Sequence, residues 1–259
     1  MSRKGALKES IRRSFSRAAA TYEEGGSPQA AAAERLAAMV RAVLPEPVGV
    51  LDIGCGTGSA ACFLGRSGAV KWIVGVDLAE GMIERASVRN IPRAAWVVGD
   101  AHALPIACES ADVALANFVF QWFENPCEVL RQVRRALAPR GFLAAAVLGH
   151  GTLAELEEAR QRAFGEAGPA RFFARGEFEA LLAAQGLEVI FSESGRETAR
   201  YGSRDEMLRK LKAVGALIGP ERPSAGLDGR RRLRRLAQIL GESGPVEAAY
   251  VVHYFLARK

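Results

Sequence analysis

The segment LDIGCGTGSAACFLGRSGAVKWIVGVDLAE, residues 51–80, decides the fold of this chain. A short apolar run ends in a turn with three glycines spaced G-x-G-x-G, and a second apolar run ends in Asp77. Glycine allows positive φ and a close approach of the backbone to a ligand at the start of a helix. Asp77 lies 19 residues beyond Gly58, where an acid can reach ribose hydroxyls. The pattern predicts a strand–turn–helix unit that holds a nucleotide-like ligand, although tight packing alone also explains such a turn.

Apolar runs and helical stretches alternate along the chain. Five continuous apolar runs have the length of buried strands: residues 48–53, 71–77, 94–100, 111–118 and 141–148. Helical patterns separate them, near residues 57–66, 80–89 and 125–138. Such runs are typical of a parallel sheet that helices cover on both faces. Two later runs, 186–193 and 247–258, predict two more strands.

Three segments lie outside this alternation. Residues 28–43 predict a helix, and we expect residues 1–45 to form an N-terminal helical cap. Helical, charged insertions near 149–175 and 200–243 follow strand ends. Ligands of open parallel sheets bind at the carboxyl ends of the strands, so these segments are expected to cover the site of an α/β domain spanning 46–259.

Composition limits the classes of function. The chain of 259 residues is 49% hydrophobic and 25% charged, with no apolar run of the roughly 18 residues that a membrane span needs. No secretory signal is recognised, so we expect a cytoplasmic protein. Four cysteines without a Cys-x-x-Cys pair and three distant histidines predict no metal site. The net charge of +6 permits an acidic partner without selecting one.

Two further acids distinguish this turn from a dinucleotide site. The third glycine of G-x-G-x-x-G is absent, and Asp52 precedes the turn. A carboxylate there disfavours a pyrophosphate and favours a cationic sulfonium and an amino group. Asp100 ends the third expected strand, where it can accept a hydrogen bond from an adenine amine or cap a helix.

Four ordered stretches resemble the class I S-adenosylmethionine-dependent methyltransferases, across about residues 46–148: LDIGCGTG, GVDLAEGMIERA, GDAHALPIACESADVALAN and ALAPRGFLAAAV. The resemblance implies a Rossmann-like, seven-stranded, mostly parallel sheet with helical cap insertions, and S-adenosyl-L-methionine as the cofactor. It implies that the glycine turn and the strand ends supply the cofactor contacts: Asp52, Gly54, Gly56, Gly58, Asp77, Leu78, Met82, Asp100, Ala101 and Asn117. Leu78 and Met82 fit equally well as core residues.

The flanking segments resemble the malonyl-acyl-carrier-protein O-methyltransferases of biotin synthesis over nearly the whole chain. The most specific parts are Phe-x-x-Ala-Ala-x-x-Tyr, from Phe15 to Tyr22, and LKAVGA at 211–216. The resemblance implies methyl esterification of the free carboxylate of malonyl-acyl-carrier protein or malonyl-CoA. The segment FQW, which begins with Phe120, also resembles trans-aconitate methyltransferases, so another small carboxylate is an alternative methyl acceptor. A quinone-like ring is a further alternative acceptor.

The acceptor side is expected to work by alignment. A carboxylate is ionised at neutral pH and needs no strong general base, while good orientation alone contributes on the order of 7 to 11 kcal/mol. We expect Tyr22 to orient the acceptor, Lys212 or Arg171 to bind its carboxylate, and His150 to line the pocket. Packing of the cap is the alternative for Tyr22, and a solvent-exposed position is the alternative for the other three.

Five arginines lie within residues 230–235, on an expected helix. Such a face can attract an acidic acyl carrier protein by charge complementarity, and a solvated helix face is the plainer interpretation. The position after the fourth strand reads ANFVFQWFENP and lacks the Asn/Asp-Pro-Pro-Tyr/Phe motif of nucleic-acid amino methyltransferases. A nucleic-acid-binding protein that retains the cofactor fold is the alternative from another class, and the absence of interleaved aromatics weakens it.

Overall fold

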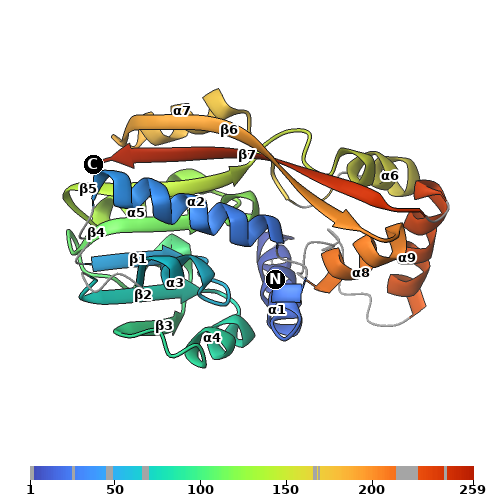
Figure 1. The fold of residues 1–259 in the computed structure, drawn as a ribbon, viewed down its shortest axis with the longest axis horizontal. Helices are drawn as coiled ribbons and strands as arrows, with labels where there is room; N and C mark the ends of the chain where they lie inside the picture. Colours follow the sequence, from blue (N-terminus) through green and yellow to red (C-terminus); the bar gives the residue numbers. More distant parts are fainter. Residues whose placement is uncertain are drawn as a thin grey trace.

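The computed structural model describes residues 3–24, 27–44, 49–65, 70–165, 168, 170–213, 227–241 and 244–259. Within these ranges the strands form one seven-stranded sheet of order β3-β2-β1-β4-β5-β7-β6 (Figure 1). The strands have these bounds: β1 Gly49–Ile53, β2 Trp72–Asp77, β3 Ala94–Val98, β4 Ala111–Asn117, β5 Leu137–Leu148, β6 Glu188–Tyr201 and β7 Val246–Arg258. The first five are parallel, and β7 runs antiparallel to both β5 and β6. The expected class I sheet is confirmed.

Helices cover both faces of the sheet (Figure 1). Their bounds are α1 Arg3–Ala18, α2 Ser27–Val43, α3 Ser59–Gly65, α4 Glu80–Ser87, α5 Pro126–Ala136, α6 Ala154–Phe164, α7 Arg175–Ala184, α8 Arg204–Ala213 and α9 Leu227–Leu240. Short 3-10 turns are η1 Tyr22–Glu24, η2 Ala101–Ala103 and η3 Phe120–Trp122.

Alternate residues of the strands build two cores. Val50 packs with Leu36 of α2 on one face, whereas the next residue, Leu51, packs in the cluster that holds Val133 of α5 and Phe178 of α7 on the other. All five side chains are fully buried. Burial on both faces explains why β1 is apolar throughout, apart from Asp52.

Strands β6 and β7 extend beyond the rest of the sheet. They pair from Glu188↔Arg258 to Tyr201↔Val246, whereas β5 pairs only with the 252–258 part of β7. Their far ends carry a lobe of α6, α8 and α9 (Figure 1). The expected strand 186–193 is therefore too short, because residues 194–201 alternate in exposure at a sheet edge and form no apolar run.

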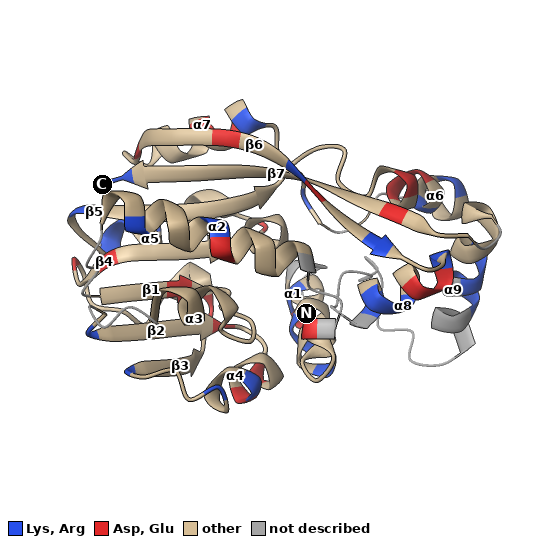
Figure 2. Ribbon diagram, in the orientation of Figure 1, with Lys and Arg blue, Asp and Glu red and all other residues tan. Residues whose placement is uncertain are grey.

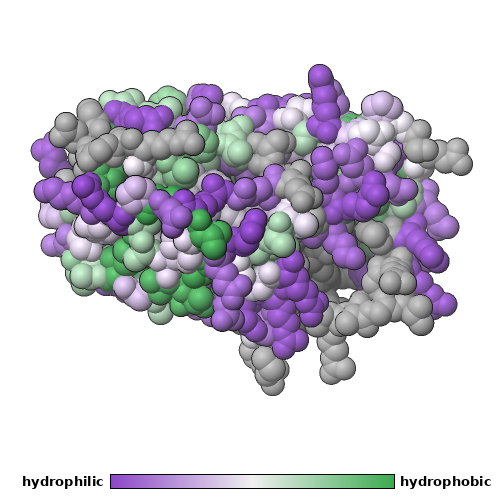
Figure 3. All heavy atoms as spheres, turned by 60° about the horizontal axis from the view of Figure 1, so that its bottom comes forward, coloured by the Kyte–Doolittle hydropathy of each residue, from purple (hydrophilic) through white to green (hydrophobic). Residues whose placement is uncertain are grey.

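The surface of the lobe is charged. Figure 2 shows Lys and Arg on α8 and α9, and in Figure 3 hydrophilic atoms cover most of the lobe, whereas hydrophobic atoms gather over the sheet. Among the described residues, no helix combines the length and the apolar character needed to cross a membrane.

Candidate cofactor and acceptor site

A cavity opens at the carboxyl ends of β1, β2 and β4, below helix α1. The glycine turn after β1 forms part of its floor, with Gly54 at φ +60° and Gly56 at φ +54°. A Cβ on Gly56 would meet only Tyr22 Cε1, at 4.0 Å, so this backbone faces open space beside the phenol. The turn thus lets the backbone approach a ligand closely at a helix start, while the N–H groups of Gly54 and Gly56 are bonded to the Val76 carbonyl and to Asp77 Oδ2.

Gly58 and Asp52 do not line the cavity. Gly58 adopts φ +81°, and a Cβ there would lie 2.6 Å from the Trp96 ring, so packing explains this glycine. Asp52 is 1% exposed beneath the turn, where its Oδ2 accepts a hydrogen bond of 3.2 Å from the Ala61 N–H at the start of α3. Burial raises the pKa of Asp52 to about 7. In the structure Gly58 therefore packs the turn against Trp96, and Asp52 holds the turn to the start of α3.

Asp77 ends β2 and lines the cavity. Its Oδ2 accepts from Gly56 N–H at 2.9 Å, and its Oδ1 accepts from Ala79 N–H at 2.8 Å. Each carboxylate oxygen has a second lone pair for a ligand hydroxyl. Burial raises the pKa of Asp77 above its ordinary value. The carboxylate therefore ties the glycine turn to the next strand and keeps acceptor capacity for a ribose.

Asp100 lies in the cavity beyond β3. Its Oδ1 accepts from His102 N–H at 3.1 Å and lies 2.9 Å from His102 Nδ1, while its Oδ2 pairs with the ammonium of Lys8. Burial opposes ionisation, but the bonds from Lys8 and His102 prevail and lower the pKa of Asp100 to about 2. Both expected roles are thus compatible, since the side chain caps η2 and also lines the cavity.

Apolar and amide groups complete the lining for a cofactor. Leu78, Met82 and Ala101 form apolar wall on the Asp77–Asp100 side. Asn117, at the end of β4, donates from Nδ2 to the Gln29 carbonyl at 2.9 Å. Its Oδ1 and Gln29 Oε1 are buried, with no hydrogen-bond partner among the described residues. Of the two residues only Asn117 is among those that line the cavity, and its unpaired acceptor is suited to a ligand that brings an N–H donor.

The wall of the cavity around Tyr22 is aromatic. The Phe15 ring lies 6.4 Å from the Tyr22 ring and 5.3 Å, edge-on, from the Trp122 ring, and all three line the cavity. Burial and the Asp77 charge raise the pKa of Tyr22 well above its usual range, so the phenol keeps its proton. The Phe15 to Tyr22 segment and the FQW segment, far apart in the sequence, thus form one wall.

Three expected acceptor residues lie outside the cavity lining. Arg171 pairs with Glu177 at 2.5 Å, and its guanidinium carbon lies 4.8 Å from the centroid of the Phe173 ring. His150 is exposed after β5, and Lys212 is exposed near the end of α8. The structure brings Tyr22 to the cofactor residues but not these three.

Sequence reasoning missed most of the contribution of α1. Leu7, Lys8 and Ile11 line the cavity together with Phe15, and their spacing places them on one helical face. The apolar residues at 7, 11 and 15 carried that signal, but the pattern alone does not say what the face covers.

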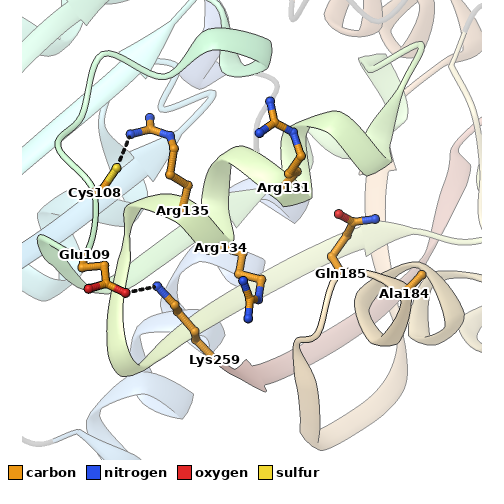
Figure 4. Close-up of a pocket in the computed structure, with 8 residues that line it drawn as sticks. All are labelled: Cys108, Glu109, Arg131, Arg134, Arg135, Ala184, Gln185 and Lys259. Carbon is orange, nitrogen blue, oxygen red and sulfur yellow. Dashed lines mark hydrogen bonds and ion pairs between the residues drawn. The ribbon is translucent and has the colours of Figure 1, made fainter.

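A second cavity lies at the opposite edge of the sheet, between α5 and α7 (Figure 4). Its cations hold protein groups: Arg131 pairs with Glu128, Arg135 donates to the carbonyls of Leu104 and Ile106, and Lys259 pairs with Glu109. In the described ranges, no group of three or more His, Cys, Asp or Glu side chains is arranged to hold a metal ion.

Comparisons with known proteins agree with this geometry. A methyltransferase domain family matches residues 51–145. The malonyl-[acyl-carrier protein] O-methyltransferase of Methylococcus capsulatus (strain ATCC 33009 / NCIMB 11132 / Bath) is 33% identical, over 88% of this chain and 84% of that protein. This chain belongs to that family. Its cofactor is accordingly S-adenosyl-L-methionine, and the expectation of a methyltransferase is confirmed.

Two further comparisons concern length and fold. The biotin biosynthesis bifunctional protein BioHC of Cellvibrio japonicus (strain Ueda107) is 33% identical over 97% of this chain, which spans half the length of that relative. A protein described as a methyltransferase from Bacillus halodurans C-125 has the same fold, with a TM-score of 0.63 and 16% identity, over 88% of this chain and 98% of its own.

The residues of the cavity fit S-adenosyl-L-methionine. Asp77 would hold the ribose hydroxyls, Asp100 the adenine amine, and the unpartnered Asn117 Oδ1 the amino group. When bound, the cofactor supplies an electrophilic methyl group on a sulfonium.

Proposed function

We propose that this chain methylates the free carboxylate of a malonyl thioester, either malonyl-acyl-carrier protein or malonyl-CoA, as a step of biotin synthesis. In the reaction a carboxylate oxygen forms a bond to the methyl carbon as the methyl–sulfur bond breaks. The bonding electrons return to sulfur, and the products are a methyl ester and S-adenosylhomocysteine. No proton has to be removed, because the acceptor is already ionised at neutral pH.

The observation that carries this proposal is the position of Tyr22. This residue belongs to the segment that resembles the family most specifically, and its ring edge lies beside Gly56 of the glycine turn. A phenol that keeps its proton can donate a hydrogen bond to one carboxylate oxygen while the other oxygen faces the methyl group. Phe15 and Trp122 exclude water around that contact, which strengthens it.

For the cation that binds the acceptor we retain Lys212 as the first candidate and Arg171 as the second. Helix α8, which bears Lys212, packs against the η1 turn that begins with Tyr22. A movement of α8 toward the cavity would therefore bring Lys212 toward the expected position of the acceptor. Arg171 would first have to leave Glu177, and His150 remains a candidate only for the outer lining.

We further propose that α9 docks the carrier protein. Arg231, Arg234 and Arg235 are exposed on this helix, whereas the Arg232 guanidinium carbon lies 4.1 Å from the centroid of the Phe164 ring. The side chain of Arg230 lies outside the described residues. An exposed run of positive charge complements the acidic surface typical of acyl carrier proteins.

A methyl-transfer assay tests the proposed reaction. Labelled S-adenosyl-L-methionine is offered with malonyl-acyl-carrier protein, malonyl-CoA, acetyl-acyl-carrier protein and trans-aconitate in parallel. We expect label in the malonyl thioesters only, as a base-labile ester. Label in trans-aconitate alone, or in no acceptor although the cofactor binds, would overturn the substrate assignment.

A further inference from the structure

Helix α1 inserts a cation into the cofactor cavity. Leu7, Ile11 and Phe15 face the cavity, and Lys8 extends from the same stretch to Asp100 Oδ2. The contact joins residues 92 positions apart, and its side chains are 47% and 32% exposed. Glu9, by contrast, pairs with Arg12 and Arg13 of its own helix. Within this part of α1, Lys8 is thus the cation that reaches the strand ends.

The contact occupies the oxygen that a ligand amine would use. Asp100 Oδ1 already accepts the His102 N–H at 3.1 Å and lies 2.9 Å from His102 Nδ1. Both contacts hold the η2 turn, which Asp100 caps. Oδ2 is therefore the oxygen through which Asp100 can receive an adenine amine without losing its own turn. In this structure the Lys8 ammonium already bonds to that oxygen, so an incoming amine would meet a positively charged donor at the one remaining lone pair.

We propose that Lys8 competes with the adenine amine of the cofactor for Asp100 Oδ2, and thereby lowers cofactor affinity and reduces the preference for a 6-amino over a 6-oxo purine. The proposal rests on the adenine contact assigned to Asp100, and not on the identity of the methyl acceptor. An ion pair between part-exposed groups is worth little, so an incoming ligand can displace it. The flexible stem of lysine lets the ammonium return to water when the amine arrives.

For a 6-oxo purine we expect Lys8 to have the opposite effect on binding affinity. A purine with oxygen at position 6 brings an acceptor toward the Asp100 carboxylate, and two acceptors repel each other. The Lys8 ammonium carries three donors, so it can bridge Asp100 Oδ2 and that oxygen. Lys8 therefore weakens binding of the adenine ligand and strengthens binding of the hypoxanthine ligand.

Titration calorimetry without any methyl acceptor tests this proposal. The probes are S-adenosylhomocysteine and S-inosylhomocysteine, on the wild-type chain, on Lys8→Met and on Arg17→Met. Methionine keeps the length and apolar stem of lysine, and Arg17 is exposed on the same helix outside the cavity. Because a surface ion pair typically contributes 0.2 to 1 kcal/mol, we expect Lys8→Met to bind S-adenosylhomocysteine about 1.4- to 5-fold more tightly.

The same variant should bind S-inosylhomocysteine more weakly, and Arg17→Met should change neither affinity. Weaker binding of S-adenosylhomocysteine by Lys8→Met would overturn the proposal, because Lys8 would then assist the cofactor. Equal affinities in all three proteins would overturn it as well. Thermal unfolding of each variant checks that the fold is retained. Since no acceptor is present, a failure here is independent of any failure to methylate malonyl thioesters.

Discussion

Replacing Tyr22 with Phe removes a hydroxyl from the cavity wall beside Gly56, where we expect the acceptor to bind. The ring contact with Phe15 at 6.4 Å does not need the hydroxyl, so the packing of the wall should persist. A hydrogen bond to a charged group contributes about 1.5 to 3 kcal/mol. Tyr22 is half-buried and its raised pKa keeps the phenol protonated, so we expect kcat/KM for the malonyl thioester to fall roughly 10- to 150-fold when the hydroxyl is removed.

The assay measures initial rates at saturating S-adenosyl-L-methionine, together with the affinity for S-adenosylhomocysteine. The affinity should stay within about twofold of wild type, because the phenol contacts the acceptor. Tyr254→Phe is the matched control. It removes a hydroxyl that donates a hydrogen bond of 3.2 Å to Glu197, and Tyr254 does not line the cavity. A rate for Tyr22→Phe within about twofold of that control would refute the role of the phenol. A parallel loss of cofactor affinity would instead identify Tyr22 as a packing residue of the cap.

Three further changes probe the turn, its buried acid and the basic helix. Gly58→Ala should destabilise the fold by about 1 to 3 kcal/mol in urea unfolding, because φ is +81° and the new Cβ would lie 2.6 Å from Trp96; an unchanged midpoint would contradict this packing role. Burial raises the pKa of Asp52 to about 7, so the folded state binds more protons than the unfolded state and wild-type stability falls as pH rises from about 4 to 7. Asp52→Asn should therefore stabilise the protein at pH about 8 and much less at pH about 4, and equal effects at both would refute the linkage. Arg231→Glu with Arg234→Glu should raise KM for malonyl-acyl-carrier protein and leave KM for malonyl-CoA unchanged; an unchanged carrier-protein KM would exclude docking at α9.

The sequence predicts the cofactor half of this molecule well because its signals are local. The glycine turn directly follows β1, Asp77 ends β2 and Asp100 comes two residues after β3, and parallel strands bring their carboxyl ends to one edge. Gly58 shows the limit, since the motif spacing does not reveal that Trp96 of β3 packs against it. Local spacing fixes where a residue lies along the chain, but not which side of the turn it faces.

The part of the site that the N-terminal and inserted segments build depends on contacts between distant segments. Lys8 meets Asp100 across 92 residues, and nothing in the local pattern of α1 specifies that encounter. The position of Arg171 could not be predicted for the same reason. Its side chain pairs with Glu177 and does not line the cavity, and this depends on how the chain enters α7. The residues 194–201 of β6 escape prediction for a related reason, since β7 rather than an apolar pattern keeps them extended.

One carboxylate links the two halves. Asp77 accepts the Gly56 N–H and so fixes the glycine turn, and its charge also adds to burial in raising the pKa of Tyr22. A phenol in that environment keeps its proton, so it can donate a hydrogen bond but is no base at neutral pH, which suits an acceptor that arrives already ionised. The same group that would hold the ribose therefore keeps the acceptor-side hydroxyl in its donor form. An acceptor that needed deprotonation, such as a ring hydroxyl, would find no help from Tyr22.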